Sequence, residues 1–222
     1  MIGELDQVKK IKRIRIAIIG VIVAIGLIAV FSPIVKFQIE KKEIKSAKKA
    51  DIVTYGNYDW KVLAVKEQKV LLVCNEFVEI KKFDESGKKV TWEDSTIRKW
   101  LNSDFYEKKF TAYEKKAIVV SEIKNQALRF GETMELKKSE TVELPNTKDR
   151  VFLLSREEVQ QYINPEGERK TPMNVNETKD SWYTRTTVLG ESWVITQPDE
   201  NECTFNLEAG IRPAIWIDKT LF

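Results

Sequence analysis

Two arginines, Arg185 and Arg212, stand among aromatic and apolar residues in the C-terminal part of the chain. A guanidinium offers a planar fork of N–H donors that matches the oxygens of a carboxylate or a phosphate. The neighbouring Tyr183 and Trp193 carry flat rings that can stack on a sugar or on a peptide side chain. The sequence therefore predicts a ligand-binding site at Tyr183, Arg185, Trp193 and Arg212.

A structural role is the alternative for the same residue types. Buried arginines often pair with carboxylates and bond to backbone carbonyls, and aromatic rings most often fill a core. Glu76 falls in an apolar run that predicts a buried strand, and Arg98 falls in an amphipathic helical segment. We expect Glu76 and Arg98 to form structural ion pairs.

Oxygen-bearing side chains are dense after the predicted aromatic site. The segment Gln197-Pro198-Asp199 matches the tripeptide of galactose-type calcium lectins. Calcium takes about six to eight hard oxygen ligands, and this part of the chain can supply several. The predicted calcium ligands are Gln197, Asp199, Glu202, Asn206 and Glu208. A polar hairpin loop is the alternative, because the spacing is compressed relative to those lectins and their Trp-Asn-Asp motif is missing.

The chain has no histidine and two cysteines, Cys74 and Cys203. This composition excludes Ser-His-Asp and Cys-His catalysis and His-ligated metals, and it argues against a structural zinc site or an iron–sulfur cluster. The carboxylates show no spacing typical of acid–base catalysis. We therefore expect no enzymatic activity and no cofactor apart from the calcium ion. Whether the two cysteines pair in a disulfide stays open.

Residues 16–35, from Ile16 to Val35, form a run of 20 residues without a charge. As a helix this run is about 30 Å long, which is the thickness of a bilayer core. It predicts a transmembrane signal anchor. Three of the four residues at positions 12–15 are basic, whereas only Lys36 directly follows the run, so we expect a cytoplasmic N-terminus. A cleaved signal peptide is the alternative, although no Ala-x-Ala-like site follows.

The predicted organisation is a basic cytoplasmic tail (1–15), the anchor (16–35), a basic stalk (36–50) and an extracytoplasmic domain (51–222). Residues 1–50 have a net charge of +7 and residues 51–222 a net charge of −4. The domain therefore offers no basic surface for nucleic acid. The stalk is either a solvated helix or a segment that lies on anionic headgroups.

Hydrophobic periodicity predicts an α+β domain. Strands are expected over residues 51–55, 58–65, 69–80, 151–154, 181–188, 192–197, 203–207 and 211–217. An amphipathic helix is expected over residues 95–105. Capping boxes predict two further helices, after Thr111 and after Ser155. Residues 121–150 are expected to be loop-like or weakly structured.

Five segments resemble a family of uncharacterised domains (domain of unknown function) of Gram-positive bacterial envelope and secreted proteins. They are YGNYDWKVLAV, TWEDSTIRKWLNSDFY, VFLLSREEV, SWYTR and GIRPAIWI, and in this order they cover most of residues 52–217. The family usually has Leu-Arg-Ser-Pro after the tryptophan, where this chain has Tyr-Thr-Arg-Thr. No activity is established for the family, so the resemblance implies a fold rather than a function. More remotely, the layout is similar to the C-type-lectin-like fold, in the branch of the formylglycine-generating enzymes.

The expected fold is a single transmembrane helix followed by a compact C-type-lectin-like mixed domain, with antiparallel strands and two to three short helices. The expected function is a non-catalytic, membrane-anchored, extracytoplasmic ligand-binding or interaction module at the cell membrane. One alternative is a structural or regulatory partner of another envelope protein, and a second is a carboxylate-based cell-envelope enzyme. The expected partners are the lipid bilayer, through residues 16–35, and a cell-wall polymer or envelope protein.

Overall fold

The computed structural model describes residues 15, 18–21, 33–132, 138–163, 181–191, 193–197 and 202–222. The chain divides into two compact units, residues 1–42 and residues 43–222. Residues 33–46 are helical. Most of the predicted anchor lies outside the described residues, and within the described ranges no helix is both long and apolar enough to cross a membrane. The anchor and its orientation therefore stay predictions.

The first sheet of the domain has the strand order β1-β2-β3-β12-β7, and all of its neighbouring strands are antiparallel. Its strands are β1 (Ile52–Tyr55), β2 (Tyr58–Lys66), β3 (Lys69–Cys74), β7 (Val151–Phe152) and β12 (Ala214–Asp218). The β1–β2 turn holds Gly56 and Asn57 at φ +59° and +66°, the left-handed values that a two-residue hairpin needs. Strand β12 lies between β3 and β7, so the C-terminal strand completes this sheet.

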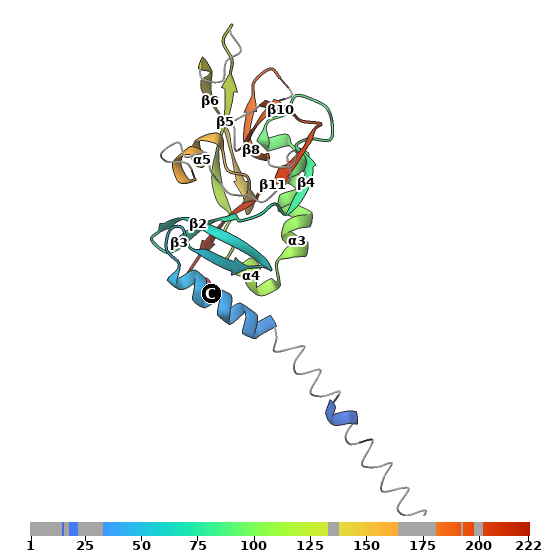
Figure 1. Ribbon diagram of the computed structural model, residues 1–222, viewed down its shortest axis with the longest axis vertical. Helices are drawn as coiled ribbons and strands as arrows, with labels where there is room; N and C mark the ends of the chain where they lie inside the picture. The colour runs from blue at the N-terminus through green and yellow to red at the C-terminus, as the bar shows by residue number, and fades with distance from the viewer. Residues whose placement is uncertain are drawn as a thin grey trace, which may run out of the picture. The chain divides into compact units, whose positions relative to one another are not determined.

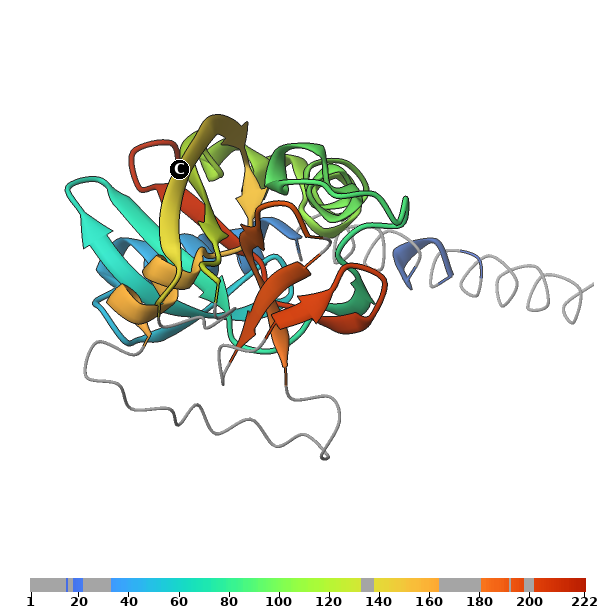
Figure 2. The same ribbon diagram turned by 90° about the horizontal axis from the view of Figure 1, so that it is seen from above.

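The second sheet is built around β8 (Trp182–Val188) and has the order β10-β9-β8-β11-β4, with β5 pairing both β6 and β8. Its other strands are β4 (Glu79–Lys82), β5 (Ser121–Arg129), β6 (Glu140–Asp149), β9 (Trp193–Gln197), β10 (Glu202–Thr204) and β11 (Glu208–Ile211). Strand β9 is antiparallel to β8, whereas β11 and β5 pair in parallel with the two ends of β8, at Trp182 and at Thr187–Val188 respectively. The cyan strands β2 and β3 of the first sheet lie apart from the orange and red strands β8 and β10 of the second sheet in both views (Figures 1 and 2).

Short helices connect the strands. Residues 96–109 form one helical segment, made of α2 (Thr96–Trp100), a π-helical turn η2 (Leu101–Phe105) and α3 (Tyr106–Lys109). A 3₁₀ turn η1 (Trp92–Asp94) precedes it, and α4 (Ala112–Ala117) and α5 (Arg156–Tyr162) complete the described helices. Both predicted capping boxes are present: Thr111 caps α4 with Glu114, and Ser155 caps α5 with Glu158.

The expected α+β class is confirmed, with largely antiparallel sheets and a few short helices. The expectation of a loop-like segment over residues 121–150 is wrong, because β5 and β6 form a long hairpin there. This hairpin extends away from β2 and β3 (Figure 1). Polar Asn125 and Thr147 occupy buried positions of the hairpin. The sequence therefore lacks the alternation of apolar and polar residues by which a strand is usually predicted.

Close packing of Phe77 on Gly210 generates a first prediction. A Cβ atom at Gly210 would lie 2.6–2.7 Å from three ring atoms of Phe77, whereas at Gly131 it would meet nothing within 4 Å. We expect Gly210→Ala to lower the free energy of unfolding by about 1–3 kcal/mol, because the ring has to move within a packed region. Urea unfolding of both variants measures the effect. Equal midpoints for Gly210→Ala and Gly131→Ala would show that the ring yields without cost.

Candidate functional site

Arg212 follows β11 and lies where three elements meet. Its side chain is 1% exposed, and its Nε donates to the carbonyl oxygen of Cys74, at the end of β3, over 2.7 Å. Its guanidinium lies 5.2 Å from the ring centre of Trp182, the first residue of β8. Gly210 pairs with Trp182, and Pro213 accepts a backbone hydrogen bond from Cys74. The backbone of two sheets therefore fixes this arginine.

The charge of Arg212 has no carboxylate partner among the described residues. Its Nη1 is buried and has no hydrogen-bond acceptor in the part of the chain that the structure describes. Burial lowers the pKa of the guanidinium to about 10, so the group still carries its charge at neutral pH. The face of an indole ring compensates a nearby cation only in part. A buried guanidinium in this state is suited to donate a hydrogen bond to an oxygen of one anionic group, a carboxylate or a phosphate.

Arg185 has the opposite environment. Its Nη1 donates to the Leu153 carbonyl over 2.7 Å and to Glu158 Oε2 over 2.5 Å, and its Nη2 donates to the Lys124 carbonyl over 2.8 Å and to Glu158 Oε1 over 3.1 Å. Glu158 belongs to α5, Lys124 to β5 and Leu153 to the segment after β7. Arg185 therefore joins three elements to β8, and both terminal nitrogens of its guanidinium are already used.

The two predicted aromatic partners also lie elsewhere. Tyr183 is buried against the edge of Phe83, with 5.5 Å between ring centres, and its hydroxyl donates to the Leu207 carbonyl. Trp193 packs on Phe130 beside a small separate cluster of Leu128, Val188 and Ile195. Since neighbouring residues of a strand point to opposite faces, Tyr183 points away from Trp182 and hence from Arg212. The structure does not bring the four predicted residues together.

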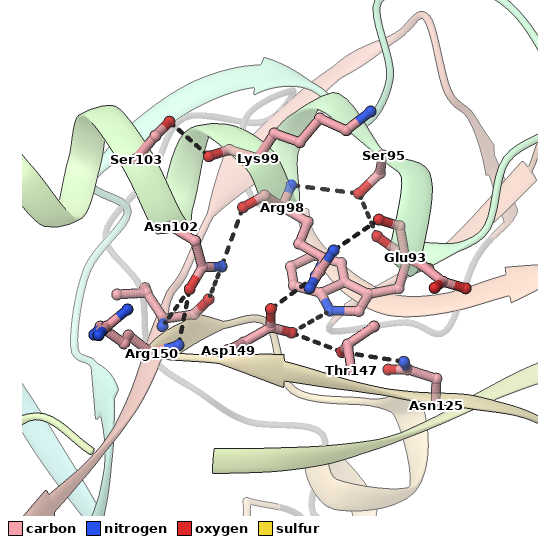
Figure 3. Close-up of polar contacts among 12 residues, drawn as sticks. Glu93, Ser95, Arg98, Lys99, Asn102, Ser103, Asn125, Thr147, Asp149 and Arg150 are labelled. Atoms are coloured by element: carbon pink, nitrogen blue, oxygen red, sulfur yellow. Dashed lines mark hydrogen bonds and ion pairs between the residues drawn. The ribbon is translucent and has the colours of Figure 1, made fainter. Parts of the chain in front are cut away.

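Arg98 forms a structural ion pair, and its partner is Asp149. The Arg98 Nε donates to Asp149 Oδ1 over 2.7 Å, while Trp92 Nε1 and Thr147 Oγ1 donate to Asp149 Oδ2 over 2.9 and 2.7 Å (Figure 3). The expected placement of Glu76 is wrong. It follows the end of β3, is exposed, and forms no ion pair among the described residues.

The predicted calcium ligands are only partly described. Asp199 lies outside the described residues. Gln197 is the last residue of β9 and Glu202 is the first residue of β10, and for these two residues the structure describes the backbone. Asn206 and Glu208 are exposed. Within the described part of the chain no group of three acidic, histidine or cysteine side chains is arranged to hold a metal ion. The calcium site stays a prediction.

Cys74 is a free thiol, buried beside Arg212, so it is not paired with Cys203. Burial raises its pKa to about 12, which keeps the thiol protonated and unreactive. Its contact with the candidate site is made by its backbone carbonyl, which sequence patterns cannot reveal. Trp182 was also missed as the partner of Arg212, although its position next to Tyr183 in a predicted strand already indicated that the two rings face opposite ways.

The contrast between the two arginines generates a second prediction. Replacing Arg185 by Met leaves the Glu158 carboxylate and two carbonyls without their donor, and we expect a loss of about 3–5 kcal/mol in the free energy of unfolding. Replacing Arg212 by Met removes one hydrogen bond but also a buried charge without a carboxylate, and we expect a change within about 1 kcal/mol. Chemical denaturation of both variants measures this difference. Equal losses would assign Arg212 a purely structural role.

Comparison with known proteins gives a match at the level of a family. The model of a domain of unknown function, DUF6273, matches residues 67–219. No curated protein and no solved structure was found to match the chain. The matched range contains Cys74, Trp182 and Arg212, so the candidate site lies within the part that defines the family.

Proposed function

The chain belongs to the DUF6273 family, a domain of unknown function, and on this premise we propose that it is a non-catalytic, membrane-anchored, extracytoplasmic binding module. Its ligand carries an anionic group that Arg212 holds, and this ligand is a component of the cell envelope. The observation that carries the proposal is the buried Arg212 guanidinium, whose Nη1 has no acceptor. Arg185 Nε is also buried without an acceptor among the described residues, but Glu158 balances the charge of that guanidinium, whereas no described carboxylate balances the charge of Arg212.

The anchor part of the proposal rests on residues 16–35, which are uncharged over a length that spans a bilayer core, and on the basic residues that precede them. Long domains that follow such a segment translocate largely regardless of their charge. The acidic net charge of residues 51–222 is therefore compatible with a domain outside the cytoplasm.

The binding part rests on charge and geometry. Arg212 is 1% exposed, so the anionic group reaches it through local opening beside Trp182. Carboxylates and phosphates are abundant in cell-wall polymers, which surround a domain held outside the membrane. The proposed likeness to the C-type-lectin-like fold agrees with a binding role, although fold alone assigns no ligand.

The anchor generates a third prediction. Full-length protein carrying one epitope tag at each end should resist carbonate extraction from membranes. On intact protoplasts, external protease should remove the C-terminal tag and spare the N-terminal tag. Val23→Lys with Ile25→Lys places two charges in the middle of the segment, at a cost of about 2.5–3.5 kcal/mol each, and should release the protein on extraction. Loss of the N-terminal tag by cleavage, with the domain in the medium, would replace the anchor by a signal peptide.

Binding to the wall generates a fourth prediction. Residues 43–222, which form a compact unit with their own core, should cosediment with Gram-positive cell-wall sacculi. Arg212→Met should lower retention at least about tenfold, the usual effect of losing one charge-assisted contact. Lys124→Met removes an exposed charge from β5 and serves as the matched control.

Three outcomes separate the possibilities. Retention that survives removal of the anionic polymers and depends on Arg212 supports a specific wall-binding module. Retention that vanishes with the polymers and is equal in Arg212→Met reflects general electrostatics and contradicts the site. Absence of retention in all variants contradicts wall binding and favours an envelope protein as the partner.

A further inference from the structure

One surface of the domain combines exposed cations with exposed apolar side chains and has no part in the Arg212 site. We call it the base surface and define it by Lys109, Tyr113, Lys116 and Leu221. All four residues are exposed, Tyr113 at 46% and Leu221 at 50%. They come from the end of α3, from α4 and from the C-terminal segment.

Contacts around Tyr55 bring these elements together. The Tyr55 hydroxyl donates to the carbonyl oxygen of Glu114 in α4 over 2.6 Å. Its ring lies 6.1 Å from that of Phe110 and 6.4 Å from that of Phe222, measured between ring centres. Figure 1 shows α4 near the C-terminus at the same end of the domain. The elements that carry the base surface therefore meet around this one buried tyrosine.

The stalk enters the domain beside this region. Ile44 and Ala47 are buried in the domain core, and the Thr54 backbone N–H donates to Glu43 Oε2 over 3.0 Å, next to Tyr55 in β1. Glu43 lies eight positions after Val35, the end of the predicted anchor. Even a fully extended chain of this length reaches only about 28 Å. The domain therefore begins within that distance of the bilayer surface.

The charge of the region is complementary to anionic headgroups. Lys45, Lys48 and Lys49 of the entering segment are exposed, and they add to the two lysines of the base surface. Two neighbouring carboxylates are already engaged: Glu107 pairs with Lys115 at 2.5 Å, and Asp51 accepts the backbone N–H of Lys48. Tyrosine beside lysine, here with Lys116 Nζ 5.7 Å from the centre of the Tyr113 ring, is typical of side chains at a membrane–water interface.

We propose that the base surface lies on the headgroups of an anionic bilayer and holds the domain down on the membrane that carries it. Lysines near such a surface gain electrostatic attraction, while Tyr113 and Leu221 transfer apolar area out of water. The inference rests on the proposed membrane anchor. It adds a second, reversible contact with lipid that involves the folded domain.

The test uses the full chain in lipid nanodiscs of phosphatidylcholine, with and without phosphatidylglycerol. An amine-reactive reagent labels exposed lysines, and mass spectrometry gives the rate at each position. We expect Lys109 and Lys116 to react about three- to tenfold more slowly in the anionic discs, because contact with the headgroups protects them. Lys88 and Lys124 are also exposed, lie outside the base surface, and should react at the same rate in both discs.

Equal rates at Lys109 and Lys116 in the two kinds of disc would overturn the inference while leaving the anchor intact. Failure of the chain to enter the discs at all would instead contradict the proposed anchor. Substitution of Tyr113 and Leu221 by Ser should restore part of the labelling in anionic discs. These side chains are exposed, so the folded domain tolerates the change, and unaltered protection in this variant would contradict an apolar contribution.

Discussion

The buried carboxylate of Asp149 holds together parts of the domain that are far apart in sequence. It accepts hydrogen bonds from Trp92, just before the helical segment over residues 96–109, from Arg98 within that segment, and from Thr147 in its own strand. A carboxylate removed from water is tolerated only when its oxygens are paired, so each donor depends on the others. Asn102 extends the connection, since its side chain bonds to the backbone of Arg150 and Val151 (Figure 3). The helical segment is thereby fixed to the β5–β6 hairpin and to β7.

Arg185 continues this polar framework toward the second sheet. It bonds to the backbone of the hairpin at Lys124, to the segment after β7 at Leu153, and to Glu158 in α5. Strand β8 is consequently held by buried charge-assisted hydrogen bonds along the same stretch that pairs with three other strands. Trp182 is the first residue of β8, so these contacts also fix its position. The ring of Trp182 in turn packs against the guanidinium of Arg212.

Local signals in the sequence predicted the elements that depend on local physics. The capping boxes at Thr111 and Ser155 and the first two strands were found because their signatures lie within a few residues of one another. The β5–β6 hairpin was missed because its buried residues include Asn125, Thr147 and Asp149. Such residues become compatible with burial only through partners such as Trp92 and Arg98, which lie about fifty residues away in the chain.

The same limit applies to the candidate site. Arg185 and Arg212 both stand among aromatic and apolar residues, and composition cannot distinguish them. Their difference arises from Glu158, which the helix after Ser155 brings to Arg185, and from the absence of an equivalent carboxylate beside Arg212 among the described residues. The alternation of side chains along β8 was available in the sequence and already separates Tyr183 from Trp182. The hydrogen bond from Arg212 to the Cys74 carbonyl cannot be predicted from a sequence pattern, because every residue type has a backbone carbonyl.

Asp149 receives donors on both of its oxygens, and the charge of Arg185 is balanced by Glu158. Arg212 differs, because no carboxylate lies beside it among the described residues, and this difference is informative. Burying a guanidinium costs free energy, and an indole face with one carbonyl returns only a part of it. A methionine of similar length would fill the same space between Trp182 and β3 without a charge. Packing alone therefore does not require the free-energy cost of burying this charge. Binding sites often carry such a cost, because the ligand supplies the hydrogen-bond acceptor that the free protein lacks. The hydrogen-bonded framework around β8 limits how far Arg212 can relax toward another acceptor, so under the proposed function its Nη1 stays unpaired until local opening beside Trp182 admits the ligand.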